Sequence, residues 1–138
     1  MTLVRDGMLS DPGALPATAS AQEAAKHLVR PDVRVVLVVD DVGGLVGVVT
    51  PDSLVDHVVA AGLDPRSTPV SQAAVPPALV LDADMTLDDG YRLLEEAEVE
   101  RAPVTEQGRL VGVLSRSVVQ RRLAEDEPPV DEEPADYS

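Results

Sequence analysis

The sequence contains no cysteine, tryptophan or phenylalanine, and only two tyrosines among its 138 residues. Without cysteine, disulfides, thiolate catalysis and cysteine-ligated zinc are all excluded. The shortage of aromatic rings leaves little surface on which bases or sugars could stack, so the core must be built from Val, Leu and Ala. Long apolar runs are also missing, because the longest, Val35–Val39, is far too short to span a bilayer.

Basic residues are scarce as well: 11 Lys and Arg face 25 Asp and Glu, which gives a formal net charge of -14. The segment Glu125–Ser138 holds seven acids, three prolines and no base, so it contributes half of that charge. This composition predicts a disordered, solubilising tail. The rest of the chain is still acidic, which argues against nucleic-acid binding. No apolar signal-peptide segment begins the chain, so we expect a soluble, cytoplasmic protein without a membrane partner.

The chain contains an internal repeat. "TASAQEAAKHLVRPDV" aligns with "DADMTLDDGYRLLEEAEV", which matches Ser20 with Thr86 at an offset of 66 residues. Further along, "GVVTPDS" aligns with "GVLSRSV" and matches Thr50 with Ser115 at an offset of 65, because the second copy has lost one loop residue. A shared frame over about fifty residues predicts two copies of one supersecondary unit.

The repeat divides the chain into a first unit at 1–62, a linker and lead-in at 63–75, a second unit at 76–124 and the tail at 125–138. Within a unit, a hydroxyl residue caps a helix, a β-branched run predicts a buried strand, a Gly-rich turn leads to a second strand, and another hydroxyl residue opens a second helix. Each unit is therefore predicted to run strand–helix–strand–strand–helix.

This double βαββα pattern resembles a tandem cystathionine-β-synthase (CBS) domain pair, often called a Bateman module. "VRDGM" (Val4–Met8) resembles the family's V-x-D-x-M, and "VERAPVTEQGRLVGVLS" (Val99–Ser115) resembles V-x-R-x-P-V, a turn and G-x-L-V-G-h-h-T/S. The first copy departs from it at Leu37, where proline is usual. The linker "AAGLDPRSTPVSQAA" resembles that of stand-alone actinobacterial two-CBS proteins of the hypoxic-response-protein type. The resemblance covers residues 1–124.

The resemblance implies an α/β fold in which two βαββα repeats pack as a pseudo-twofold pair with two clefts, and a homodimer formed through the CBS helices. It also implies an adenosyl ligand (AMP, ADP, ATP or S-adenosylmethionine). In the family, strand residues hold adenine, the motif hydroxyl reaches ribose or phosphate, and an Asp three residues later takes the ribose hydroxyls. The candidate ligand-binding residues carried over to this chain are Val36, Thr50, Asp52, Ser53, Ala102, Ser115 and Arg116.

Both copies lack the acid of the family's T-x-x-D pattern. Ser53 and Val118 stand in its place, and only Ser53 can form a side-chain hydrogen bond. A structural explanation is favoured for both charged candidates: Asp52 as an acid that complements the dipole in the first turn of a helix, and Arg116, with Arg121 and Arg122, as cations near a helix end. Val36 and Ala102 need no ligand to explain them, because core strands contain such residues.

Other chemistry is scarce. His27 and His57 lie on different predicted helices without an acid–nucleophile arrangement, and "GGLVG" lacks the spacing and lysine of a phosphate-binding loop. We therefore expect no enzyme activity, no metal site, and no cofactor beyond an adenosyl nucleotide. One hypothesis is a regulatory module that senses an adenosyl ligand and acts in trans on a protein partner. The other is a ligand-free dimeric scaffold, which the missing acids favour; intact Thr50 and Ser115 favour the sensor, which we place first.

Overall fold

The computed structural model describes residues 1–126. The first part of the chain forms α1 (Val4–Gly7), β1 (Leu9–Ser10), β2 (Leu15–Pro16), α2 (Ala21–Leu28), β3 (Val36–Val39), β4 (Leu45–Val49), α3 (Pro51–Leu54) and its π-helical continuation η1 (Val55–Val59). The second part forms the 3-10 helix η2 (Val70–Ala73), β5 (Leu81–Asp82), α4 (Leu87–Ala97), β6 (Arg101–Glu106), β7 (Arg109–Ser115) and α5 (Arg116–Asp126). This order confirms the predicted βαββα pattern in both repeats.

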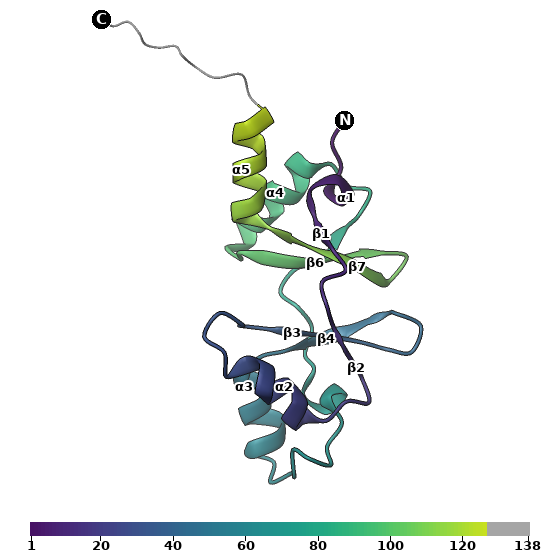
Figure 1. The fold of residues 1–138 in the computed structure, drawn as a ribbon, viewed down its shortest axis with the longest axis vertical. Helices are drawn as coiled ribbons and strands as arrows, with labels where there is room; N and C mark the ends of the chain where they lie inside the picture. Colours follow the sequence, from purple (N-terminus) through teal and green to yellow (C-terminus); the bar gives the residue numbers. More distant parts are fainter. Residues whose placement is uncertain (127–138) are drawn as a thin grey trace, which may run out of the picture.

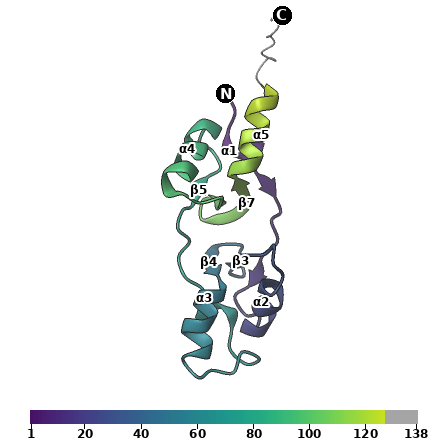
Figure 2. The ribbon, with the colours of Figure 1, turned by 90° about the vertical axis from the view of Figure 1, so that its left-hand side faces the viewer.

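Two sheets face each other in the middle of the molecule, and the helices cover their outer sides (Figures 1 and 2). One sheet has the order β1-β7-β6-β5, and the other has the order β2-β3-β4. Helices α1, α4 and α5 lie over the first sheet, while α2 and α3 lie over the second (Figure 1). The predicted α/β fold of two packed repeats is therefore confirmed.

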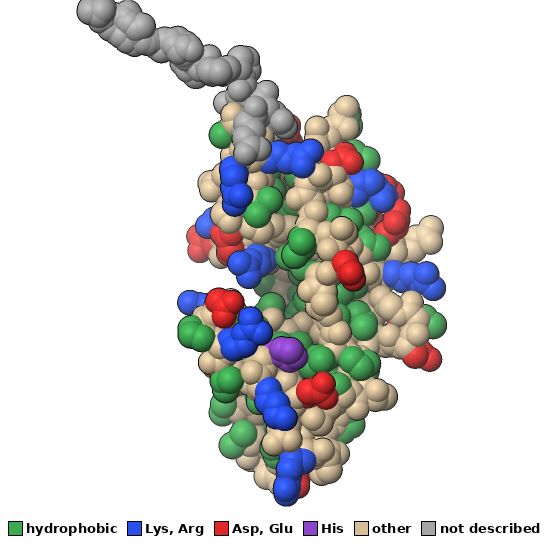
Figure 3. Space-filling model, in the orientation of Figure 1, with side chains coloured by type: hydrophobic (Ala, Val, Ile, Leu, Met, Phe, Trp, Pro, Cys, Tyr) green, Lys and Arg blue, Asp and Glu red, His purple; other side chains and the backbone are tan. Residues whose placement is uncertain are grey.

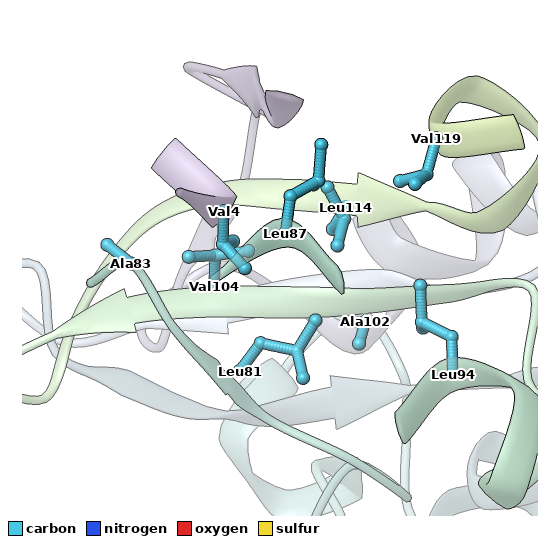
Figure 4. Close-up of a cluster of buried hydrophobic side chains, with 9 residues drawn as sticks. All are labelled: Val4, Leu81, Ala83, Leu87, Leu94, Ala102, Val104, Leu114 and Val119. Atoms are coloured by element: carbon cyan, nitrogen blue, oxygen red, sulfur yellow. The ribbon is translucent and has the colours of Figure 1, made fainter. Parts of the chain in front are cut away.

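Each half has its own apolar core between its sheet and its helices. The core of the second half is drawn in Figure 4 and is formed by Val4, Leu81, Ala83, Leu87, Leu94, Ala102, Val104, Leu114 and Val119. In the first half, Val36, Val38 and Val49 point toward the helices, whereas Leu37 and Val48 are buried outside that core. Since successive strand residues point to opposite faces, Leu37 and Val48 lie on the face turned toward the other half.

The helix at the C-terminal end is longer than the sequence indicates. Helix α5 runs to Asp126 and so includes the first two residues of the segment 125–138 that the sequence analysis assigns to an acidic tail. Residues from 127 onward lie outside the described residues. Arg121 and Arg122 lie on α5 and are exposed.

The two halves exchange short segments. The N-terminal segment joins the second repeat: the Val4 N–H donates to the Met85 carbonyl at 2.8 Å, and Leu9 of β1 pairs with Val113 of β7. Ion pairs from Arg5 to Asp84 and Glu106 strengthen the same contact.

The linker after the first repeat makes the reciprocal contact. The Val70 N–H donates to the Ala19 carbonyl at 2.6 Å, and Val75 bridges to Val48 of β4. These contacts match those of the N-terminal segment at the repeat's own offsets of 66 and 65 residues, so the exchange obeys the pseudo-twofold symmetry. A spatial half therefore does not coincide with a continuous sequence repeat.

Two glycines allow the exchanged segments to approach. A Cβ atom added to Gly47 would lie 2.7 Å from the Val75 carbonyl oxygen, and one added to Gly112 would lie 2.7 Å from the Leu9 carbonyl oxygen. Both contacts are with backbone, which cannot rotate away as a side chain would. The glycine of the "GVVT" and "GVLS" motifs is thus required by backbone packing between the strand and the exchanged segment.

We expect Gly47→Ala and Gly112→Ala each to lower the free energy of unfolding by about 1–3 kcal/mol, because the added methyl group forces the exchanged segment off its strand. Urea unfolding of the variants against wild type measures this change. Val46→Ala, on the same strand as Gly47 but 43% exposed, is the control and should change stability much less. If the glycine variants unfolded at the same urea concentration as Val46→Ala, close packing would not explain the motif.

Candidate functional site

In both repeats a hydroxyl residue ends the last strand and caps the helix that follows. The candidate ligand-binding residues form one set in each repeat. The set of the first repeat comprises Val36, Thr50, Asp52 and Ser53, and that of the second repeat comprises Ala102, Ser115 and Arg116. The register of each hairpin brings its set together, since Val36 pairs with Val49, just before Thr50, and Ala102 pairs with Leu114, just before Ser115. Among the described residues, no hydrogen bond or ion pair joins the two sets.

In the first repeat, Thr50 and Ser53 form a closed capping box. Thr50 Oγ1 accepts from the Ser53 N–H at 3.1 Å, and Ser53 Oγ accepts from the Thr50 N–H at 2.9 Å. The Ser53 hydroxyl also donates to the Thr50 carbonyl at 3.0 Å, and Ser53 is only 5% exposed. Ser53, which stands where the family pattern has its acid, therefore uses its hydroxyl group to cap the helix. Asp52 lies in the same first turn and is exposed, as expected for an acid that complements the helix dipole.

In the second repeat, a carboxylate that the sequence analysis did not single out occupies the helix start. Glu100 Oε2 accepts from the Ser117 hydroxyl at 2.8 Å, from the Ser117 N–H at 3.2 Å and from the Ser115 hydroxyl at 3.2 Å. The Arg116 Nε atom lies 4.0 Å from Glu100 Oε1. The candidate residues Ser115 and Arg116 thus surround an anionic group supplied by the chain itself.

These contacts change the acidity of Glu100. Hydrogen bonds from the Ser117 hydroxyl and the Ser117 N–H hold the pKa of the Glu100 carboxyl below its usual range, with smaller help from Ser115 and the Arg116 charge. The side chain is 48% exposed, so solvent weakens the interaction with Arg116. At neutral pH the Glu100 carboxylate is therefore ionised and bound to the start of α5.

Val36 and Ala102 face the helices rather than the space between the halves. Their side chains belong to the two apolar cores and are 8% and 2% exposed. Their backbone groups point toward the neighbouring strand of each hairpin, where Val36 pairs with Val49 and Ala102 pairs with Leu114. In the described part of the chain, β2 pairs with Val38 and Val39 but not with Val36, and β5 pairs with Val104 and Thr105 but not with Ala102. Both repeats therefore leave a strand edge without a strand partner beside a capped helix.

The tips of the two hairpins contact each other at the pseudo-twofold axis. The Leu45 N–H donates to the Gly108 carbonyl at 3.1 Å, and the Leu110 N–H donates to the Gly43 carbonyl at 3.0 Å. These two hydrogen bonds are symmetry mates under the offset of 65 residues. They tie the repeats together at the end of the sheets that is remote from Thr50 and Ser115.

An open pocket of about 350 Å³ lies between the halves at this end. It is lined by the loop 11–14 that leads from β1 to β2, by Val39 and Gly43 of the first repeat, and by Leu110 and Val111 of β7. None of the seven candidate residues lines it. Leu110 and Ser115 are five residues apart on one strand, about 16 Å, so the pocket is separate from the Glu100 contact. In Figure 3 a separate indentation between the two halves lies on the left-hand side, away from the hairpin tips, and is bordered by charged side chains of both signs.

A match to a protein-family model now accounts for the repeat. The model of the CBS domain matches residues 4–60 and again residues 70–125. The chain belongs to the CBS domain family. It contains two CBS domains in tandem, which confirms the resemblance inferred from its motifs.

Relatives share this organisation over nearly their whole length. Hypoxic response protein 1 of Mycobacterium tuberculosis is 28% identical over 125 residues, which cover 91% of this chain and 87% of the relative. The crystal structure of Hypoxic Response Protein I with two coordinated zinc ions matches with a TM-score of 0.73 at 27% identity, covering 88% of this chain and 99% of that one. The structure of CBSX2 in complex with AMP matches with a TM-score of 0.72 at 27% identity, covering 91% and 98%.

Two further features concern metals and membranes. Over residues 1–126, no three or more His, Cys, Asp or Glu side chains gather into a group that could hold a metal ion. Within the same residues, no helix combines the length and the apolar character needed to cross a membrane.

One signal in the sequence could have identified Glu100. The motifs "VERAPV" and "GVLS" are the two strands of one hairpin, and Arg101 pairs with Ser115. Since antiparallel pairing around a short turn fixes the register, the residue before β6 must lie beside the first residue of α5. The Arg116 N–H indeed donates to the Glu100 carbonyl at 2.7 Å.

We expect Glu100→Gln to lower the free energy of unfolding by about 0.5–1 kcal/mol at neutral pH, the low end for a helix cap because Glu100 is half exposed. A carboxyl whose pKa is lowered in the folded state stabilises the protein above its unfolded pKa, and this contribution disappears as the pH falls through the folded pKa. The difference between variant and wild type should therefore shrink as the pH is lowered from neutral to below the ordinary pKa of a glutamate, about 4.3.

Urea unfolding across this pH range measures the effect. Glu95→Gln on α4 is the control, since the described residues offer the Glu95 side chain no hydrogen bond or ion pair. A stability difference for Glu100→Gln that was independent of pH would contradict a role for the ionised carboxylate.

Proposed function

We propose that the chain is a regulatory CBS pair, without catalytic activity of its own, that senses an adenosyl ligand in a cleft between its repeats. The ligand then changes how the protein contacts a partner in trans. The observation that carries this proposal is the matched pair of open strand edges, on β3 before Val38 and on β6 before Val104, each beside a helix capped by a hydroxyl residue. Backbone groups that point outward from such an edge can form the hydrogen bonds that an adenine ring offers.

The relative with AMP supports the ligand class. CBSX2 shares 27% identity and a TM-score of 0.72 with this chain, and its structure is a complex with AMP. The departures from the family pattern point to weaker binding here. Ser53 is committed to the capping box and Val118 has no polar side-chain atom, so neither can hold the ribose hydroxyls as an acid would. Recognition would therefore depend mainly on adenine.

Calorimetric titration with adenosine, AMP, ADP, ATP and S-adenosylmethionine tests the sensor. We expect saturable binding of at least one compound, and about three- to tenfold weaker binding to Ser115→Ala, because one hydrogen bond to the ligand is lost. Ser71→Ala is the control, since Ser71 is exposed on η2 and the described residues give its hydroxyl no hydrogen bond. Absence of binding at millimolar ligand would reject the sensor.

A second function, a ligand-free dimeric scaffold, is favoured by a different observation. Both capping hydroxyls are already engaged within the chain, Thr50 with Ser53 and Ser115 with Glu100 and Ser117. The helix formed by α3 and η1 also exposes two valines one turn apart, since Val55 and Val59 are 55% and 67% exposed. We propose that this helix contributes to a homodimer interface, whether or not a ligand binds.

If so, Val55→Asp combined with Val59→Asp should weaken the dimer at least about tenfold, because two apolar side chains would be replaced by charges in the interface. Sedimentation velocity over a concentration series measures the dissociation constant. Val42→Asp provides the control, as Val42 is 61% exposed in the hairpin turn away from α3. A wild-type chain that sediments as a monomer at all concentrations would exclude the dimer.

A further inference from the structure

Three backbone N–H groups at the start of α5 are satisfied within the chain. The Arg116 N–H donates to the Glu100 carbonyl at 2.7 Å, and the Ser117 N–H donates to Glu100 Oε2 at 3.2 Å. The Val118 N–H donates to Ser115 Oγ at 3.3 Å. These are three of the four N–H groups that a helix start leaves without an intrahelical acceptor. Both hydroxyls beside them also contact the Glu100 carboxylate.

Glu100 is not needed merely to cap the helix. In the first repeat the matching helix begins with a capping box of two hydroxyl residues, Thr50 and Ser53, and no carboxylate of residues 1–126 takes part. In the second repeat Ser115 already caps Val118 in the same way. The residue that matches Glu100 in the first repeat, 66 positions earlier, is Arg34, which has the opposite charge. The carboxylate is thus specific to the second repeat.

We propose that Glu100 determines the ligand class of the second-repeat cleft by occupying the position that a phosphate would take. This inference rests on the proposed adenosyl-binding function and deepens it. The cleft beside Ser115 then accepts adenosyl compounds that place no phosphate at the start of α5, such as a free nucleoside, and excludes nucleotides.

The exclusion has two physical causes. A phosphate near α5 would be repelled by the Glu100 carboxylate at contact distance, and the site is half exposed, so we expect an effect of at least about tenfold in affinity. A phosphate that displaced the carboxylate would gain the Ser115 and Ser117 donors and the Arg116 charge, but Glu100 would lose the same contacts. Binding a nucleotide therefore yields little net gain from these groups.

The experiment compares adenosine with AMP by calorimetric titration of the full chain. In wild type we expect adenosine to bind more tightly than AMP. Glu100→Ala should raise the affinity for AMP at least about tenfold and leave the affinity for adenosine within about twofold. Glu95→Ala, a charge removal on α4, should leave the ratio of the two affinities unchanged. An unchanged ratio in Glu100→Ala would overturn the inference.

A second readout does not depend on adenosyl binding. Inorganic phosphate is titrated into 15N-labelled wild type and Glu100→Ala, and the amide signals of Ser117 and Val118 are followed by NMR. Saturable shifts in the variant alone support exclusion by Glu100. Equal shifts in both proteins, or none in either, overturn it. If no adenosyl compound binds to any variant while phosphate shifts the Glu100→Ala amides, the proposed function fails and the exclusion stands.

Glu100→Gln is the second variant, to be used in case Glu100→Ala unfolds the helix α5. It keeps an acceptor for Ser117 and removes only the charge, so α5 should remain folded even if Glu100→Ala unfolds it, as far-ultraviolet circular dichroism will show. The gain in AMP affinity should then be smaller than in Glu100→Ala but still exceed that of Glu95→Gln. A Glu100→Gln protein that matched Glu95→Gln in AMP affinity would contradict an electrostatic cause.

Discussion

Each half of the molecule is completed by a segment that the sequence attaches to the other half. The N-terminal segment pairs with β7, and the linker after η1 bridges to β4, through backbone contacts that pass over Gly112 and Gly47. Neither core is complete without the exchanged segment: Val4 and Val70 are fully buried in the core of the half to which they are exchanged. The two repeats must therefore fold as one unit.

This constraint also places the site. Because the exchanged segments and the touching hairpin tips fix the two sheets relative to each other, the starts of α3 and α5 are held at defined positions by hairpins whose register cannot slip. A register shift of one residue would turn Val36 and Ala102 out of their cores. The helix starts, and with them Thr50 and Ser115, are thus positioned by packing that involves the whole chain.

Much of the fold could be predicted because its signals are local. The β-branched run at Val33–Val39, the capping residues Ser20 and Thr86, and Pro51 at the start of a helix all specify elements from a few neighbouring residues. Because the sequence is repeated, the same order of elements could be predicted for both halves of the chain. The exchange was not predictable in the same way, because Leu3–Thr86 and Ser20–Pro69 are long-range backbone contacts without a sequence pattern of their own.

The site was predicted only in part, for a related reason. A sequence motif shows which positions belong to the site, but it does not show which groups their side chains contact in the fold. Ser53 was expected to retain a hydrogen bond for a ligand, yet its hydroxyl is buried in the capping box. Glu100 was overlooked because it lies fifteen residues before Ser115, and only the hairpin between them brings the two together. The helix at residues 116–126 extends into an acidic segment that composition alone assigned to the tail.

The difference between the repeats bears on how such a module could respond to a ligand. A ligand shifts a conformational equilibrium only through its differential affinity for the two states, and two identical clefts would respond alike. Here the matched positions 34 and 100 carry opposite charges, and among the residues that the structure describes only the second helix start is bound by a carboxylate from its own hairpin. A ligand at Ser115 must either leave the contact between β6 and α5 intact or break it. The position of α5 relative to its sheet is therefore coupled to the chemistry of the ligand in the second cleft, while the first helix start, closed by Thr50 and Ser53, lacks that coupling.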